Sequence, residues 1–147
     1  MYGNHARTLD DRSRIILPAK LRENISSSKV YLTLNNDGEF NFAEIRDQNT
    51  FERWLNDLVE QNSYDKSTRM LRRLWLGRTT EVELDSQGRI LIPKQYISQL
   101  AIQKDVTLLG VGEFIELWAT QQYEQYENSL TPEAINQATE KLAKGAY

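Results

Sequence analysis

Short segments in which apolar and polar residues alternate make up much of the chain, and such alternation is typical of half-buried β-strands. The segment 29–34 is rich in β-formers, and the segment 39–45 carries apolar side chains at alternate positions. The residues between them, Asn35 to Gly38, are typical of a hairpin turn. The same reasoning predicts further strands at 5–10, 15–17, 79–84, 89–92, 104–110 and 114–118.

The period of the apolar positions changes to that of a helix in the middle of the chain. Apolar residues from Phe51 to Val59 recur three and four positions apart, which predicts an amphipathic helix over about 48–61. Asp65 suits the N-cap of a second helix over about 66–77. One face of that helix is apolar and the other is basic, with Lys66, Arg69, Arg72 and Arg73. Further helices are expected at 18–25, at 93–100, from about 120 and from Thr131.

A ten-residue motif occurs twice in the chain. The segments 9–18 and 84–93 share five identical positions, and the offset between them is 75 (84 − 9 and 93 − 18). Asp10 and Asp85 can accept backbone N–H groups two residues ahead and so start a tight turn. Gly88 supplies a positive φ, and the arginine after it begins a new strand. The motif therefore predicts a strand, a turn, a strand and a short helix, present in two copies.

Ser13 stands in the first copy where the second copy has Gly88. A left-handed backbone at this position would cost a serine about 1 kcal/mol of strain. We therefore expect the first copy to form a slightly different turn.

The motif Leu-Asp-x-x-(Gly/Ser)-Arg-Ile-x-x-Pro in two tandem copies resembles the MraZ family, which is part of the broader AbrB-like group of DNA-binding proteins. Blocks at 1–3, 69–77 and 108–118 agree, so the resemblance covers residues 1 to about 128. It implies a transcriptional regulator of the bacterial division and cell-wall gene cluster, which binds direct repeats in double-stranded DNA upstream of its own operon. It also implies a homo-oligomeric ring of about eight subunits, cytoplasmic and associated with the nucleoid.

Two half-units of this size would each be marginal alone, so we expect them to share one core. The resemblance implies an α+β fold, in which two tandem β-α-β-type repeats form a double-split β-α-β barrel with peripheral helices. The expected division is a first repeat at 3–48, linking helices at 49–78, a second repeat at 79–119 and C-terminal helices at 120–147. The last helix has a thin apolar stripe, which indicates either mobility or a partner.

Basic residues gather in two segments, although the net charge of the chain is −3. Residues 1–22 hold five basic and two acidic residues, residues 66–78 hold five basic and no acidic ones, and residues 113–147 hold six glutamates and two lysines. Such segregation lets one face bind an anion while the molecule stays acidic. The predicted DNA-binding residues are Arg7, Arg12, Arg14, Lys20, Arg22 and Arg89, and the predicted turn residues are Asp10, Ser13, Asp85 and Gly88.

Two roles are open for Arg14 and Arg89. Each can contact a phosphate or a guanine edge, or it can pair with its own loop aspartate and fix the turn, and both roles can hold together. Arg89 follows acidic residues and has Gln87 where the first copy has Arg12. We therefore expect the first copy to contribute more to DNA binding than the second.

Three roles are open for the basic face of the helix at 66–77: a second DNA contact, a subunit interface or a solvated charged face. Because the helix contains no acidic residue, its cations have no partner within it. We expect groups outside the helix to neutralise them, either phosphates or glutamates of a neighbouring copy.

The sequence offers little for catalysis. His5 is the only histidine and cysteine is absent, which excludes a multi-histidine metal site and a thiolate metal site. We therefore expect no enzyme activity, cofactor, bound metal or small-molecule substrate, and no membrane span. The alternative function is a non-DNA-binding assembly or partner-binding protein that uses the same duplicated barrel as an oligomer.

Overall fold

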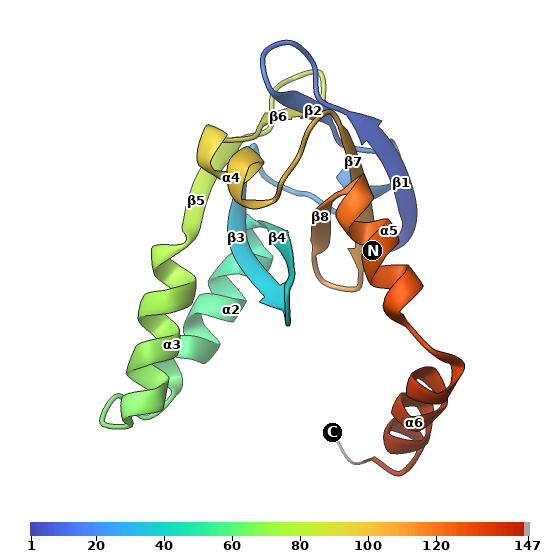
Figure 1. The fold of residues 1–147 in the computed structure, drawn as a ribbon. Coiled ribbons are helices and arrows are strands. Elements are labelled where there is room, and N and C mark those ends of the chain that lie inside the picture. The colour runs from blue at the N-terminus through green and yellow to red at the C-terminus, as the bar shows by residue number, and fades with distance from the viewer. Residues whose placement is uncertain (146–147) are drawn as a thin grey trace.

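The computed structural model describes residues 1–145 and shows an α+β fold (Figure 1). The first half contains β1 (Tyr2–Thr8), β2 (Arg14–Ile16), α1 (Ala19–Arg22), β3 (Lys29–Asp37), β4 (Phe40–Asp47), α2 (Gln48–Glu60) and α3 (Lys66–Gly77). The second half contains β5 (Thr79–Glu83), β6 (Arg89–Leu91), α4 (Lys94–Gln99), β7 (Asp105–Val111), β8 (Ile115–Ala119), α5 (Thr120–Ser129) and α6 (Pro132–Ala143).

The strands of the two halves interleave around an internal twofold axis. Six strands form one antiparallel sheet in the order β1-β7-β8-β4-β3-β5, and β2 and β6 form a separate two-stranded ribbon. Exchanging each strand with its counterpart (β1 with β5, β3 with β7, β4 with β8) reverses this order and leaves the sheet the same. Where the axis passes through the sheet and through the ribbon, a residue of one half pairs with the equivalent residue of the other half. Glu44 on β4 pairs with Glu116 on β8, and Ile15 on β2 pairs with Ile90 on β6. The expected pair of repeats sharing one core is confirmed.

The core lies between the sheet and the ribbon. Ile15 and Ile90 are fully buried on the inner face of the ribbon, and Tyr96 on α4 is 1% exposed. The Tyr96 hydroxyl lies 2.6 Å from the carbonyl oxygen of Arg78 and 2.9 Å from that of Leu32, and burial raises the pKa of Tyr96 to about 12. The hydroxyl, which has one proton to donate, lies within hydrogen-bond distance of both oxygens and so links α4 to the start of β5 and to β3.

Two pairs of helices leave the body on opposite flanks (Figure 1). The helices α2 and α3 form a hairpin on one flank, and α5 and α6 extend along the other. Asp47 caps α2 by accepting the backbone N–H of Thr50 at 2.9 Å, and Asp65 caps α3 by accepting that of Ser67 at 3.0 Å. Both helices match their predicted ranges within one residue. Within residues 1–145, no helix is long and apolar enough to cross a membrane.

Several predicted boundaries are wrong by a few residues because strand pairing sets them. The first strand spans 2–8 rather than 5–10, since β1 pairs with β7 from Tyr2 to Thr8. The strands β3 and β4 pair as far as Asp37 and Phe40, so the hairpin turn is shorter than the segment from Asn35 to Gly38. Pro18 precedes α1 as its N-cap, and α1 has only 4 residues.

Candidate nucleic-acid interface

The two copies of the motif form two turns with nearly the same geometry. In the first turn, Oδ1 of Asp10 accepts the backbone N–H groups of Arg12 at 2.8 Å and of Arg14 at 2.9 Å. In the second turn, Oδ1 of Asp85 accepts the N–H groups two and four residues ahead, the latter from Arg89, both at 2.9 Å. In both copies the aspartate thus accepts two backbone N–H groups of its own turn.

Each turn also holds its arginine by a side-chain ion pair. Nε of Arg14 lies 2.9 Å from Oδ2 of Asp10, and Nε of Arg89 lies 2.8 Å from Oδ2 of Asp85. Both arginine side chains are 25% exposed, and among residues 1–145 their terminal nitrogen atoms have no hydrogen-bond partner. The aspartate therefore fixes the guanidinium through one edge and leaves its terminal N–H groups for an external ligand.

Hydrogen bonds keep both aspartates ionised. The backbone N–H of Arg14 is the largest cause that lowers the pKa of Asp10 below its ordinary value of 3.8, and partial burial acts in the opposite direction. The backbone N–H of Arg89 lowers the pKa of Asp85 in the same way. Both carboxylates therefore stay ionised to a lower pH than an ordinary aspartate does.

The turn at Ser13 is not the different turn that we expected from the sequence. Ser13 has φ +61 and Gly88 has φ +76, so both residues are left-handed. The N–H of Ser13 bonds to the carbonyl of Asp10 at 3.1 Å, and that of Gly88 bonds to the carbonyl of Asp85 at 3.0 Å. Because the flanking hydrogen bonds are the same in both copies, they fix the backbone at Ser13 against its steric preference.

The surroundings of Ser13 and Gly88 differ in the space that they leave for a side chain. A Cβ atom on Gly88 would lie 2.6 Å from Cζ of Arg22, whose Nε is buried without a hydrogen-bond partner among residues 1–145. The counterpart of Arg22 is Ile97 (22 + 75), and Ile97 and Ser13 line the same open pocket. A side chain at position 88 would therefore have to displace the Arg22 side chain, in addition to straining the left-handed backbone.

The outer face of the β2–β6 ribbon joins the two turns. Arg14 lies opposite Leu91, and Ile16 lies opposite Arg89. Ile16 is 50% and Leu91 53% exposed, so the face presents two arginines on one diagonal and two aliphatic side chains on the other. Neighbours along each strand are about 7 Å apart. The two aliphatic residues were missed by sequence reasoning, although each follows a buried isoleucine and so belongs to the opposite face.

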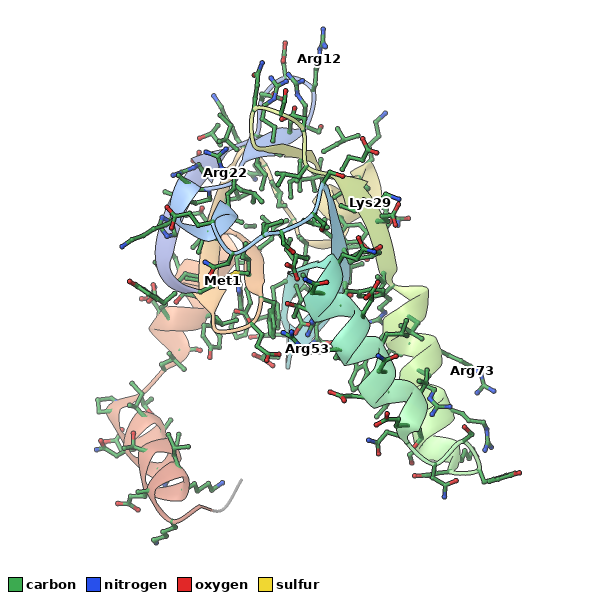
Figure 2. All side chains as sticks on the ribbon, turned by 180° about the vertical axis from the view of Figure 1, so that it is seen from behind. Met1, Arg12, Arg22, Lys29, Arg53 and Arg73 are labelled. Carbon is green, nitrogen blue, oxygen red and sulfur yellow. The ribbon has the colours of Figure 1, made fainter. Side chains whose placement is uncertain are left out.

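The other predicted basic residues lie at varying positions around this face. Arg12 lies at the tip of the first turn and points away from the body (Figure 2). Nζ of Lys20 lies 5.3 Å from the centre of the Tyr2 ring, and Nη1 of Arg7 donates to the carbonyl of the preceding residue at 2.7 Å. The structure gathers Arg12, Arg14, Arg22 and Arg89 at the ribbon and its turns. Arg7 lies on β1, and Lys20 lies on α1 next to Tyr2 of β1.

Two cations of the basic helix α3 have partners within the chain, which corrects the expectation of phosphates or a neighbouring copy. Arg72 donates to the carbonyls of Leu58 at 2.9 Å and Gln61 at 2.7 Å, and to Oγ of Ser63 at 2.9 Å. Arg69 donates to the carbonyl of Ser63 at 3.0 Å. These oxygens belong to the C-terminal end of α2 and the loop after it, where the helix dipole favours a cation.

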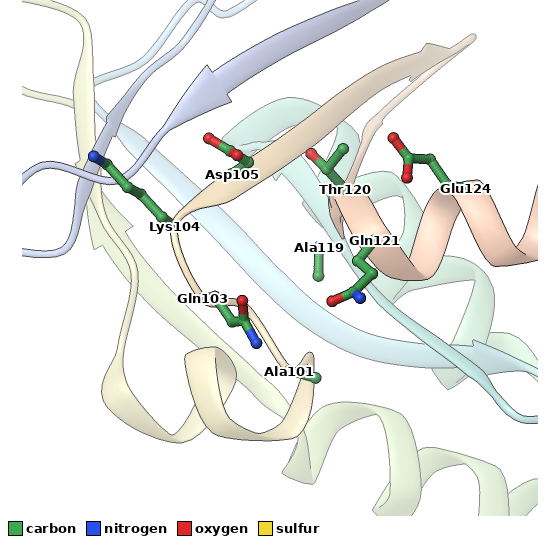
Figure 3. A pocket seen from close by; sticks show the side chains of 8 residues that line it. All are labelled: Ala101, Gln103, Lys104, Asp105, Ala119, Thr120, Gln121 and Glu124. Carbon is green, nitrogen blue, oxygen red and sulfur yellow. The ribbon is translucent and has the colours of Figure 1, made fainter.

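A pocket of about 370 Å³ lies between the loop after α4 and the start of α5 (Figure 3). Its side chains carry both signs of charge, with Lys104, Asp105 and Glu124, and Oδ1 of Asp105 accepts a hydrogen bond from Thr8 at 3.2 Å. Within residues 1–145, no group of three or more His, Cys, Asp or Glu residues is placed to hold a metal ion. The ribbon is therefore the candidate site.

Comparisons with known proteins agree on one family. The profile of the MraZ protein family, described as antitoxin-like, matches residues 1–74 and again 75–144. The chain is 39% identical to the transcriptional regulator MraZ of Mycoplasmopsis pulmonis over 97% of this chain and 94% of that protein. It is 35% identical to the protein of the same name from Mesoplasma florum, over 86% and 85%. It is 33% identical to that from Mycoplasma mobile, over 99% of each. A weaker similarity, with 17% identity and a TM-score of 0.33, is found to the solution structure of PHS018 from Pyrococcus horikoshii, over 78% of this chain and 84% of that one.

Proposed function

The chain belongs to the MraZ family, and on that premise we propose that it is a transcriptional regulator that binds double-stranded DNA through the outer face of the β2–β6 ribbon. The observation that carries the proposal is the pair of turns in which Asp10 holds Arg14 and Asp85 holds Arg89. Each arginine is positioned by a rigid turn and keeps its terminal N–H groups free of partners among residues 1–145. This arrangement suits bidentate recognition of a phosphate or a guanine.

The aliphatic residues of the same face support base contact over phosphate contact alone. Ile16 and Leu91 are about half exposed and lie directly beside the two arginines. A two-stranded ribbon fits the major groove, where aliphatic side chains can contact the methyl group of thymine. The proposed site thus combines arginines for guanine or phosphate with aliphatic side chains for thymine. Arg12 and Arg22 add positive charge at the turns.

The proposed operator consists of direct repeats upstream of the chain's own operon, read by a homo-oligomer with several ribbons, in a ring of about eight subunits. One ribbon neutralises only a few phosphates, so a single subunit should bind weakly and with a shallow dependence on salt. Several ribbons on matched repeats would convert later contacts into intramolecular ones. The regulator would act in the cytoplasm, at the nucleoid.

A gel-shift titration tests the proposal, with the upstream region of the chain's own operon compared with random duplex at the same salt concentration. Arg14→Ala should weaken binding by about 1–3 kcal/mol per contact, and Arg89→Ala by less, because acidic residues precede it. Arg53→Ala on α2 is the matched control, since it removes an arginine far from the ribbon, and it should bind as the parent does. Equal affinity for both duplexes, or unchanged binding by both ribbon variants, would favour the partner-binding alternative.

A further inference from the structure

The C-terminal helix α6 is amphipathic, but its apolar side is open to solvent. Ile135, Ala138 and Leu142 recur at helical spacing, three and then four residues apart, and Ile135 is 51% and Leu142 69% exposed. Every residue from 127 to 145 is exposed. A helix of 12 residues is marginal in water by itself, so α6 is expected to gain stability from a surface that covers its apolar stripe.

A comparison of the two halves of the chain shows that α6 lacks the packing contact that α3 has. The counterpart of α2 is α5, and α3 follows α2 as α6 follows α5. In the first half, α3 turns back along α2 and Arg72 fastens the hairpin to the end of α2. In the second half, α6 continues away from the body without such a return (Figures 1 and 2). The position occupied by α3 in the first half thus has no equivalent packing in the second.

The α2–α3 hairpin carries a groove of suitable character. The groove has a volume of about 350 Å³ and is lined by Trp54, Asp57, Leu58, Gln61, Thr68, Leu71 and Trp75. Exposed apolar residues lie close by on the same two helices, with Met70 56% and Val59 53% exposed. A helix with an apolar stripe at positions i, i+3 and i+7 is the usual ligand of such a groove.

The charges of the two segments are complementary. The hairpin segment 48–78 carries six basic and four acidic residues, whereas the segment 120–145 carries four glutamates and two lysines. Arg69 and Arg72 are engaged with backbone oxygens, but Arg73 points outward from α3 (Figure 2). Opposite net charges bring such surfaces together and disfavour the pairing of two like hairpins.

We propose that α6 of one chain docks in the α2–α3 groove of a second copy of the chain. The donor helix and the acceptor groove lie on opposite flanks of the body, so one chain cannot readily fill its own groove (Figures 1 and 2). Each copy then gives one helix and receives one, which is a head-to-tail contact that continues from copy to copy until the assembly closes. The contact does not involve the ribbon and does not depend on DNA binding.

The absence of cysteine from the sequence makes the contact directly testable by cross-linking. Ile135→Cys is placed in one preparation and Leu71→Cys in a second, size-tagged preparation, and the mixed subunits are treated with a short bis-maleimide. The expected product is a covalent pair of one tagged and one untagged chain. The control is Tyr64→Cys in place of Leu71→Cys, because Tyr64 is 93% exposed on the same hairpin but outside the groove. A yield no higher than this control would overturn the proposal.

A second measurement separates contact between copies from contact within a copy. In a chain that carries both Ile135→Cys and Leu71→Cys, the proposal predicts a ladder of linked chains, and a cross-linked monomer would contradict it. Light scattering of Leu142→Glu should show a fall in mass toward the 17.1 kDa of one chain. Gln137→Glu changes the charge equally at a polar position of α6 and should keep the mass of the parent. An unchanged mass for Leu142→Glu, or a parent that is already monomeric, would also overturn the proposal.

Discussion

At the scale of single residues, the internal twofold axis allows residues of one half of the chain to be compared with the equivalent residues of the other half. Glu44 and Glu116 are counterparts, and each accepts a hydrogen bond from the residue two positions ahead. Oε1 of Glu44 accepts from Nη1 of Arg46 at 2.9 Å, whereas Oε1 of Glu116 accepts from Nε1 of Trp118 at 3.0 Å. The first carboxylate therefore has a cationic partner and the second has a neutral one. Burial raises the pKa of Glu116 above its ordinary value of 4.5.

This difference predicts a pH dependence of stability. The folded chain binds the Glu116 proton more tightly than the unfolded chain does, so stability falls as the pH rises from 4.5 through the raised pKa. Glu116→Gln removes this loss while keeping an acceptor for Trp118. The gain in melting temperature of the variant over the parent should therefore be larger at pH 7 than at pH 4.5. Glu124→Gln, at an exposed position of α5, is the control and should show no such difference.

The two turns predict opposite outcomes for exchanges between serine and glycine. Ser13→Gly should raise the free energy of unfolding by about 0.5 kcal/mol, because relief of left-handed strain exceeds the added entropy of the unfolded chain. Gly88→Ser should lower it by about 2 kcal/mol or more, since it adds both strain and a collision with Arg22. Urea unfolding at fixed protein concentration measures both.

The collision can be isolated by removing the arginine. In an Arg22→Ala background, Gly88→Ser should cost only the strain of about 1 kcal/mol. If the cost of Gly88→Ser is the same with and without Arg22, space is not the reason for glycine in the second turn.

At the scale of elements, the sequence predicts helices better than strand ends. The helix periods over 48–61 and 66–77 are local, and α2 and α3 end within one residue of them. The limits of β1 depend on its pairing with β7, about a hundred residues away, and no local pattern contains that information. The interleaved strand order likewise came from the family resemblance, not from periodicity. For the candidate site, the repeated motif marked Arg14 and Arg89, whereas Ile16 and Leu91 required the ribbon register.

Arg72 is the element-scale feature that sequence reasoning missed, and it predicts a specific loss of order. Arg72→Met removes three hydrogen bonds to the end of α2 and the following loop, at a cost of about 1–3 kcal/mol to the hairpin. Amide hydrogen exchange should become faster at residues 58–65 and stay unchanged in the ribbon. Arg73→Met removes the neighbouring, exposed cation and serves as control. Similar exchange in both variants would mean that Arg72 does not hold the hairpin.

At the scale of the whole molecule, the fold places the surfaces proposed for DNA binding and for assembly in different regions. The ribbon lies at one end of the body, while the α2–α3 hairpin and the α5–α6 arm extend from its two flanks (Figure 1). Subunits can therefore join through the flanks while every ribbon stays accessible. This separation is what the proposed recognition of several DNA repeats requires.

The number of repeats in the DNA should consequently determine affinity. At fixed salt, raising the number of repeats from one to three or four should strengthen binding by about 10²–10⁴, because the later contacts are intramolecular. Inserting half a helical turn between repeats should remove most of that gain, since it rotates the next repeat away from its ribbon. Titration of DNA duplexes with one to four repeats measures both effects. Binding of one repeat as tight as that of four would contradict the multivalent mechanism.

The difference between the closed α2–α3 hairpin and the open α5–α6 arm gives the chain a polarity. Two identical halves would present the same structure on both flanks, and the chain would then have no distinct front and back. Because the halves have diverged, the chain has a front and a back, and copies joined front to back all face the same way. The two ends of each ribbon also differ, with Arg12 near one and Gln87 near the other. In an assembly of this kind all the ribbons have the same orientation. Direct repeats in the DNA would therefore suit it better than inverted repeats.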